Sequence, residues 1–151
     1  DFQESLLPDL QTGSADGYDC LGYVTYPAET LVNASYIMDG DDVFYAVGTG
    51  YFTALPEGSK ILVQRDSSRD PLEGVFHGED ESTDAFLNGI MGFSYEGKDK
   101  DGNEVNITLF ANSMTESGHQ RDEYAFISNA LFASFLTDTP YVTTAATTGS
   151  N

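Results

Sequence analysis

In the stretch EVNITLFA, residues 104–111, apolar side chains at positions 105, 107, 109 and 111 alternate with polar ones at 104, 106 and 108. A period of two is typical of a β-strand that has one face on a core and the other in solvent. The segment before it, residues 97–103, contains Asp101-Gly102, a strong signal for a tight hairpin turn. We therefore predict a hairpin whose strands are residues 85–96 and 104–111.

The rest of the chain continues this pattern. From Tyr18 onward, short runs of aromatic and β-branched residues are separated by turn residues, as in β-sandwiches and β-barrels. Further strands are predicted at residues 18–26, 29–38, 43–52, 60–65 and 74–77, with a last edge at 141–144. Residues 123–136 fit a helical period in part, but their Phe-rich composition and the flanking strands favour a strand.

These segments predict an all-β protein, a single antiparallel β-barrel of about eight strands. Residues 1–17 are expected to form an N-terminal arm, residues 18–146 the barrel domain and residues 147–151 a flexible tail. With 151 residues, 40% of them apolar, the chain is long enough to bury a sizeable core. No apolar run approaches the roughly 20 residues that cross a bilayer, so no membrane insertion is expected.

The charge of the chain is strongly one-sided, with 25 acidic against 6 basic residues and a net charge of −19. Nucleic acid and anionic lipid would be repelled, because binding them needs clustered Lys and Arg. The expected partners are neutral apolar molecules, cations or basic surfaces. Composition leaves the formation of a homo-oligomer open.

Two sequons, at Asn33 and Asn106, match the acceptor pattern for N-glycosylation. Both fall in predicted strands with the Asn on the polar face, so both are expected to face solvent. Together with a chain that begins at Asp1 rather than Met, they predict a protein of the secretory pathway or the extracellular space. Cys20 is the only cysteine, so no intramolecular disulfide is expected, and a buried apolar role is favoured over a reactive thiol.

Two blocks of the chain carry a family resemblance. The first is ASYI at 34–37, followed by DD at 41–42 and VFYA at 43–46, and the second is AFLNGIM at 85–91. Over about half of the chain, these blocks resemble a family of small lipocalin-like barrels catalogued as domain of unknown function 3237. The resemblance implies a lipocalin-like or allene-oxide-cyclase-like barrel with a pocket, and it implies no particular reaction. The family has a Trp-containing motif and this chain has no Trp, so a rearranged or extended barrel is an expected variant.

Motifs for metal or covalent chemistry are weak. Residues 99–104 alternate acidic side chains like a calcium loop, but Glu104 stands where an EF-hand has Gly, so a solvated turn is favoured. His77 and His119 lie in predicted loops without HxH, HExxH or CxxC spacing, which favours surface histidines. No G-x-S-x-G motif is present. We predict no metal site and no cofactor.

Aromatic residues are the main resource of the chain, with 10 Phe and 9 Tyr. Core packing accounts for most of them, but barrels of about eight strands often hold a small ligand in the open end of the lumen. The ligand-binding residues predicted for such a lumen are Tyr36, Tyr45, Tyr51, Phe86, Asn88 and Phe93. The candidate catalytic residues are Arg65, His77 and Tyr95, with Arg65 singled out because a cation at the barrel mouth would bind an anionic ligand group.

Two functions are consistent with these features. The first is a secreted barrel that binds a hydrophobic small molecule in its lumen, with steering of its cyclisation or coupling as a type of catalysis that needs no triad, metal or cofactor. The alternative is a non-enzymatic, acidic secreted glycoprotein that acts as a surface or interaction module. A deep apolar pocket favours the first function, and a filled core with an exposed aromatic patch favours the second.

Overall fold

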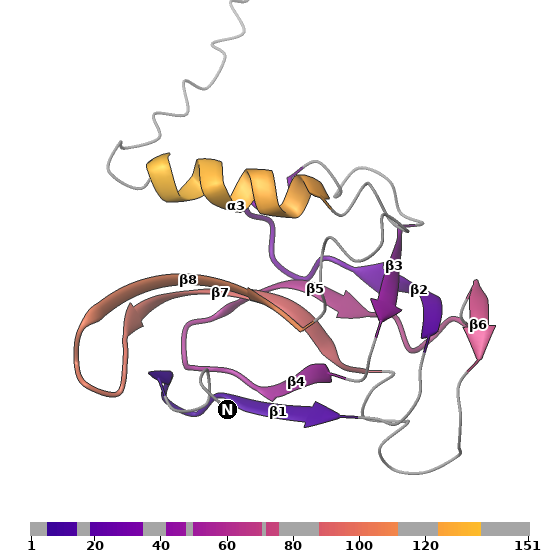
Figure 1. Ribbon diagram of the computed structural model, residues 1–151, viewed down its shortest axis with the longest axis horizontal. Coiled ribbons are helices and arrows are strands. Elements are labelled where there is room, and N and C mark those ends of the chain that lie inside the picture. The colour runs from indigo at the N-terminus through magenta and orange to yellow at the C-terminus, as the bar shows by residue number, and fades with distance from the viewer. Residues whose placement is uncertain are drawn as a thin grey trace, which may run out of the picture.

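The computed structural model describes residues 6–14, 19–34, 42–47, 50–70, 72–75, 88–111 and 124–136. In this part of the chain, eight strands form an antiparallel sheet and one 13-residue helix lies over it (Figure 1). The predicted all-β, mainly antiparallel class is confirmed. The elements are β1 (Gln11–Ser14), β2 (Asp19–Thr25), β3 (Val43–Val47), β4 (Gly50–Ala54), β5 (Lys60–Arg65), β6 (Glu73–Val75), β7 (Ile90–Lys98), β8 (Glu104–Phe110) and α3 (Tyr124–Leu136).

The strand order is β1-β4-β7-β5-β2-β3, with β8 paired to β7 and β6 paired to β2. Within the described residues, the two ends of this order, β1 and β3, do not pair with each other. The sheet is therefore not shown to close into the predicted barrel. It curls instead, so that β1 and β4 lie beneath β7 and β8 in Figure 1.

The inside of this curl is filled with side chains. Phe52 of β4 packs edge-on against Phe93 of β7, with ring centroids 5.0 Å apart. The same cluster contains Leu7, Leu10 and Tyr95, and apolar residues of β8 pack against it. Where the sequence predicted an open lumen, the described part of the chain has a largely packed core.

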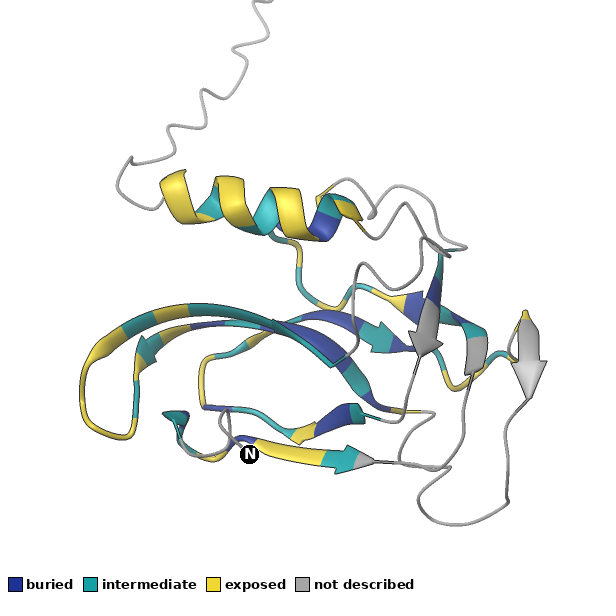
Figure 2. Cartoon of the chain, viewed as in Figure 1, coloured by how far each residue is buried: buried dark blue, intermediate teal, exposed yellow. Residues whose placement is uncertain are grey.

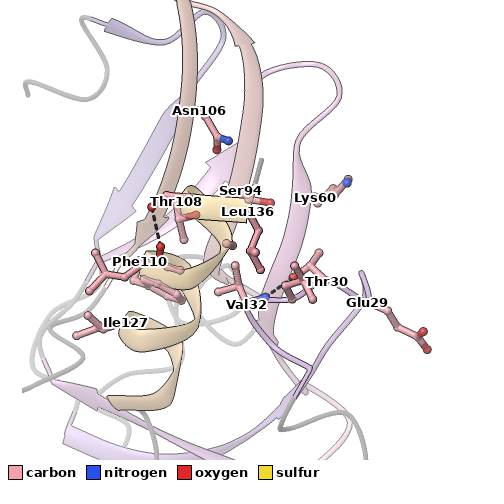
Figure 3. Close-up of a pocket in the computed structure, with 15 residues that line it drawn as sticks. Glu29, Thr30, Val32, Lys60, Ser94, Asn106, Thr108, Phe110, Ile127 and Leu136 are labelled. Carbon is pink, nitrogen blue, oxygen red and sulfur yellow. Dashed lines mark hydrogen bonds between the residues drawn. The ribbon is translucent and has the colours of Figure 1, made fainter. Parts of the chain in front are cut away.

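β7 and β8 form the predicted hairpin, in register from Lys98 opposite Glu104 to Gly92 opposite Phe110. The alternation predicted for β8 is confirmed on its apolar side, because Val105, Ile107 and Leu109 pack against the cluster inside the curl. The other side of β8 faces α3 (Figure 3). Residues of both faces therefore contribute to packing, and only the distal part of the hairpin is exposed.

The Asp99 carboxylate holds the hairpin turn together. One of its oxygens accepts hydrogen bonds from the backbone N–H groups of Asp101 (2.9 Å) and Asn103 (2.8 Å), and the other accepts one from the Asn103 side-chain amide (2.9 Å). Gly102 has a φ of +87°, which glycine adopts without strain. The hydrogen bond from the Asn103 side chain is the main reason why the pKa of Asp99 lies below its usual value, and backbone N–H groups add to the effect.

The stability of this turn should therefore depend on pH in the acid range. The folded pKa of Asp99 lies below the value of an unfolded aspartate, about 3.9, so its contribution to stability is complete above that value. The contribution is lost as the pH falls through the lower, folded pKa. A carboxyl-carbon NMR titration should give a pKa below about 3.9 for Asp99. Asn103→Ala should raise this pKa and Asn88→Ala should not, whereas an ordinary pKa in the unmodified protein would contradict this account.

Most strand predictions hold, but the N-terminal half differs from the prediction in several places. The strands predicted at residues 18–26, 60–65 and 74–77 correspond to β2, β5 and β6. Residues 43–52, predicted as one strand, form β3 and β4, because β3 pairs with β2 while β4 pairs with β1 and β7. The predicted N-terminal arm contains β1, whose short run of polar residues gave no strand signal. Residues 141–144 and 147–151 lie outside the described residues.

The prediction of a strand at residues 123–136 is wrong, because Tyr124–Leu136 form the helix α3. Phe126, Asn129, Ala130 and Ala133 recur at helical spacing. Phe126 is only 1% exposed, and both alanines pack against the core around it. The centroid of the Phe126 ring lies 5.5 Å from that of Phe110, and the ring also contacts those of Phe44 and Tyr26. Residues three to four positions apart must face the same core to make these tertiary contacts. This requirement favours a helix over a strand despite the Phe content of the segment.

Candidate functional site

A groove with a volume of about 630 Å³ lies between α3 and the face of the sheet formed by β5, β7 and β8 (Figure 3). Its floor consists of Lys60, Ser94, Asn106, Thr108 and Phe110. Its roof consists of Ile127, Ala130, Leu131, Ala133, Ser134 and Leu136, all from α3, and residues 29–32 form one side. Most of this lining is apolar.

The groove opens because of the order of side chains along α3. At the N-terminal end of the helix, the large ring of Phe126 fills the space between helix and sheet. One and two turns later the helix presents Ala130 and Ala133, with Ser134 beside them, toward the same side. Because these side chains are small, they leave space between α3 and the β7–β8 hairpin.

The side of the groove at residues 29–32 runs into a turn at residues 31–34, and Asn33 fixes this turn. Its side-chain oxygen accepts hydrogen bonds from the N–H of Thr30 (2.9 Å) and the hydroxyl of Thr30 (3.1 Å). Its amide donates to the carbonyls of Ala28 (2.7 Å) and Leu62 (3.0 Å). The Asn129 amide of α3 donates to the carbonyl of Val32 (3.0 Å). The turn is thus tied to β5 on one side and to the helix on the other.

The strand predicted over residues 29–38 is therefore wrong for residues 31–34, which form this turn. The prediction that Asn33 faces solvent is wrong as well, because Asn33 is 0% exposed. Both N–H groups of its amide already donate to main-chain carbonyls, so a glycan at Asn33 is incompatible with this fold. Asn106 is exposed on β8, as predicted, and it is the one of the two sequons that this fold leaves accessible to a glycan.

The polar groups of the groove are mostly uncharged. Ser94 and Thr108 offer hydroxyl groups on the floor, and Asn106 offers an amide toward one end. The charged lining residues are Glu29 and Lys60, both exposed, and their side chains point away from α3 in Figure 3. The centre of the groove therefore combines apolar walls with hydrogen-bonding groups that carry no charge.

Three of the residues predicted to bind a ligand or to act in catalysis lie in the packed core instead. Tyr51, Phe93 and Tyr95 are buried, and none of them lines the groove, although Tyr51 lines the smaller cavity described below. The Tyr95 hydroxyl donates to the carbonyl of Lys98 (2.8 Å) and accepts from the N–H of the same residue (3.1 Å). Tyr95 thus stabilises the end of the β7–β8 hairpin, and its hydroxyl is hydrogen-bonded to the backbone.

Arg65 and Asn88 also lie away from the groove. Arg65, predicted at a barrel mouth, is 6% exposed in β5, and its guanidinium fills the space over Gly22 where a side chain would otherwise stand. Asn88 is exposed before β7, and its carbonyl accepts a hydrogen bond from the Gln64 amide (3.1 Å). Of the predicted site residues whose side chains are described, none lines the groove, and Phe93 and Tyr95 share the packed cluster inside the curl.

The side chains of the remaining predicted residues lie outside the described part of the chain. Tyr36, His77, Phe86 and His119 lie outside the described residues. Tyr45 and Cys20 belong to β3 and β2, but their side chains are outside the described part.

A second, smaller cavity of about 150 Å³ is lined by residues of β1, β4 and the end of β8, among them Tyr51. It is the nearest feature to the predicted lumen. In the described ranges, no group of three or more His, Cys, Asp and Glu side chains is arranged to hold a metal ion. No helix found in those ranges has the length and apolar character needed to span a membrane.

Comparison with known proteins adds no identity. No family model, no curated protein and no solved structure matches this chain.

The groove residues that the sequence analysis missed are those of α3. Ala130, Ala133 and Ser134 are small side chains in a segment predicted as a strand, and small residues carry no chemical signal by themselves. The partial helical period of residues 123–136 was the available signal, because a helix would have placed Phe126, Ala130 and Ala133 on one face. Ser94 and Thr108 lie on strands that were predicted, and Thr108 was assigned to the polar face of its strand.

Proposed function

We propose that the protein binds a neutral, mainly apolar small molecule in the groove between α3 and the β7–β8 hairpin. The observation that carries this proposal is the groove itself, whose volume of about 630 Å³ lies within the range of small-molecule sites, roughly 300–1,000 Å³. Such sites combine apolar walls with a few hydrogen-bonding groups that orient the ligand. The walls from α3 and the hydroxyls of Ser94 and Thr108 supply both. Closure of the sheet into a barrel is not required, because this groove lies outside the curl.

The charges of the protein favour a neutral ligand. A net charge of −19 repels anions at long range, and the charged lining residues, Lys60 and Glu29, are exposed and opposite in sign. A charged ligand group at the centre of the groove would lose its hydration without gaining a counter-charge. A hydroxyl or carbonyl oxygen on an apolar skeleton would instead find Ser94 or Thr108 within the groove. We therefore assign the ligand to neutral apolar molecules with one or two such oxygens.

The described lining supports binding more directly than catalysis. Its titratable side chains are Glu29 and Lys60, which stand at the exposed rim. Steering of a cyclisation or coupling would have to act through shape and through hydrogen bonds from Ser94, Thr108 and Asn106. That extension rests on the binding function and follows only once binding is established.

Two fluorescent probes and one substitution test the binding function. N-phenylnaphthylamine is neutral and apolar, and anilinonaphthalene sulfonate has the same skeleton with an added negative charge. We expect the neutral probe to bind and its sulfonate to bind at least about tenfold more weakly. Ser134→Leu should weaken binding of the neutral probe at least about tenfold, because the larger side chain fills the groove.

Ser128→Leu is the matched control. Ser128 and Ser134 are both exposed on α3, and both hydroxyls donate to the carbonyl three residues earlier, at 3.0 Å and 2.7 Å. Ser128 does not line the groove, so Ser128→Leu should change the dissociation constant less than about twofold. Equal effects of the two substitutions, or stronger binding of the sulfonate, would refute the proposed site.

A further inference from the structure

The outer side of α3 is unusually apolar for an exposed helix. None of its 13 residues is Asp, Glu, Lys or Arg, in a chain that has 25 acidic residues. Large apolar side chains on it are exposed, including Leu131 (58%), Phe132 (67%) and Phe135 (79%). Figure 2 shows most of the helix surface as exposed. A helix that is apolar on all sides is normally buried on all sides.

The exposed apolar area is large enough for a specific contact. On the side of α3 that faces away from the sheet, the large exposed apolar side chains are Tyr124, Leu131, Phe132 and Phe135, hereafter the α3 patch. With roughly 200 Å² for a large apolar side chain, their exposed fractions amount to roughly 500 Å². This value lies toward the upper end of the largest apolar patches on monomeric proteins. Two such patches together reach roughly 1,000 Å², the area that a specific protein interface should clear.

We propose that the α3 patch binds a second copy of this chain, with the two α3 helices packed antiparallel about a two-fold axis. The spacing along the helix supports this arrangement. One stripe along the helix contains residues that recur every three to four positions, namely Tyr124, Ser128, Leu131 and Phe135. This spacing is typical of the contact face of two helices that pack on each other. An antiparallel pair with Tyr124 opposite Phe135 of the second copy also sets the small Ser128 opposite Leu131. A single two-fold axis thus matches ring with ring and small with large side chains.

Charge distinguishes this occupant from others. Two copies with a net charge of −19 repel each other, so their contact must lie where charges are absent, and α3 is such a segment. Salt should strengthen the contact, because the Debye length falls from about 10 Å at 0.1 M to about 3 Å at 1 M. A basic partner protein would show the opposite salt dependence, since its attraction to this acidic chain would be screened.

Sedimentation equilibrium of the full chain at 0.1 M and 1 M sodium chloride tests the proposal. We expect a monomer–dimer equilibrium whose dissociation constant falls at least about tenfold at the higher salt. Phe135→Asp should raise the dissociation constant at least about tenfold, because it places a charge in the contact. Leu72→Asp is the matched control, since Leu72 is 53% exposed away from α3, and it should change the constant less than about twofold.

Two results would overturn the proposal. One is a protein that stays monomeric at high salt. If such a monomer also floats with phosphatidylcholine vesicles in a density gradient, the α3 patch binds a neutral lipid surface instead of a second copy. The other is a dimer that Phe135→Asp and Leu72→Asp weaken equally. Phe135 does not line the groove, so binding of N-phenylnaphthylamine to Phe135→Asp reports on the proposed function separately. Circular dichroism confirms that each variant is folded.

Discussion

Phe126→Ala is expected to release α3 from the sheet and to abolish probe binding in the groove. Phe126 is 1% exposed and is the buried large side chain of the helix. Its ring contacts those of Phe44 (6.2 Å between centroids), Phe110 (5.5 Å) and Tyr26 (6.3 Å). Removing a buried Phe side chain costs about 3–5 kcal/mol. Since few other large contacts hold the helix, most of this loss should fall on its docking.

Hydrogen exchange measured by mass spectrometry checks this prediction. The amides of residues 124–136 should exchange at least about a hundredfold faster in Phe126→Ala, which corresponds to about 2.8 kcal/mol. Phe135→Ala makes the same change in the same helix at a side chain that is 79% exposed, so it controls for intrinsic helix propensity. It should accelerate exchange less than about fivefold when the protein is dilute. Similar protection of α3 in both variants would show that Phe126 does not anchor the helix.

Asn33→Ala is expected to lower the free energy of unfolding by about 3 kcal/mol. The substitution removes hydrogen bonds to Ala28, Leu62 and Thr30 at once. Asn33 is fully buried, so the carbonyls of Ala28 and Leu62 lose a partner that water cannot easily replace. The turn that these bonds fix also receives the Asn129 amide of α3, so the groove should lose part of its wall.

Urea denaturation followed by circular dichroism measures this loss. Asn106→Ala is the control, because it removes the same side chain from an exposed position on β8 and should change the free energy of unfolding by less than about 0.5 kcal/mol. A loss in the free energy of unfolding below about 1 kcal/mol for Asn33→Ala would mean that the hydrogen bonds of Asn33 contribute little to stability.

Sequence patterns predicted an element correctly where the spacing of its apolar residues matches the spacing of its buried residues in the structure. The alternation in residues 104–111 predicted β8, and Asp101-Gly102 predicted the turn before it. Both depend on neighbours within a few residues. β1 was missed because QTGS has no apolar alternation, and its strand conformation comes from pairing with β4, some 40 residues away.

The candidate site was harder to predict, for the same reason. Asn33 matches a sequon, but its partner Leu62 lies 29 residues away and only the folded chain brings them together. The Phe-rich segment at residues 123–136 has β propensity, yet Phe126 and the two following alanines fit a core only as a helix. The groove exists because the side chains that α3 turns toward the sheet are large at its N-terminal end, where Phe126 stands, and small further along, at Ala130 and Ala133. The pattern of residue types along the sequence does not reveal an open space between two packed elements.

Intermolecular NMR contacts of bound N-phenylnaphthylamine test the central claim most directly. The claim is that the ligand site lies under α3 and not inside the curl of the sheet. We predict nuclear Overhauser effects from the probe to the methyl groups of Ala130, Ala133 and Thr108, all of which line the groove. Contacts confined to Leu10 and Leu109, on the inner side of the sheet, would contradict the claim and return the ligand to the interior.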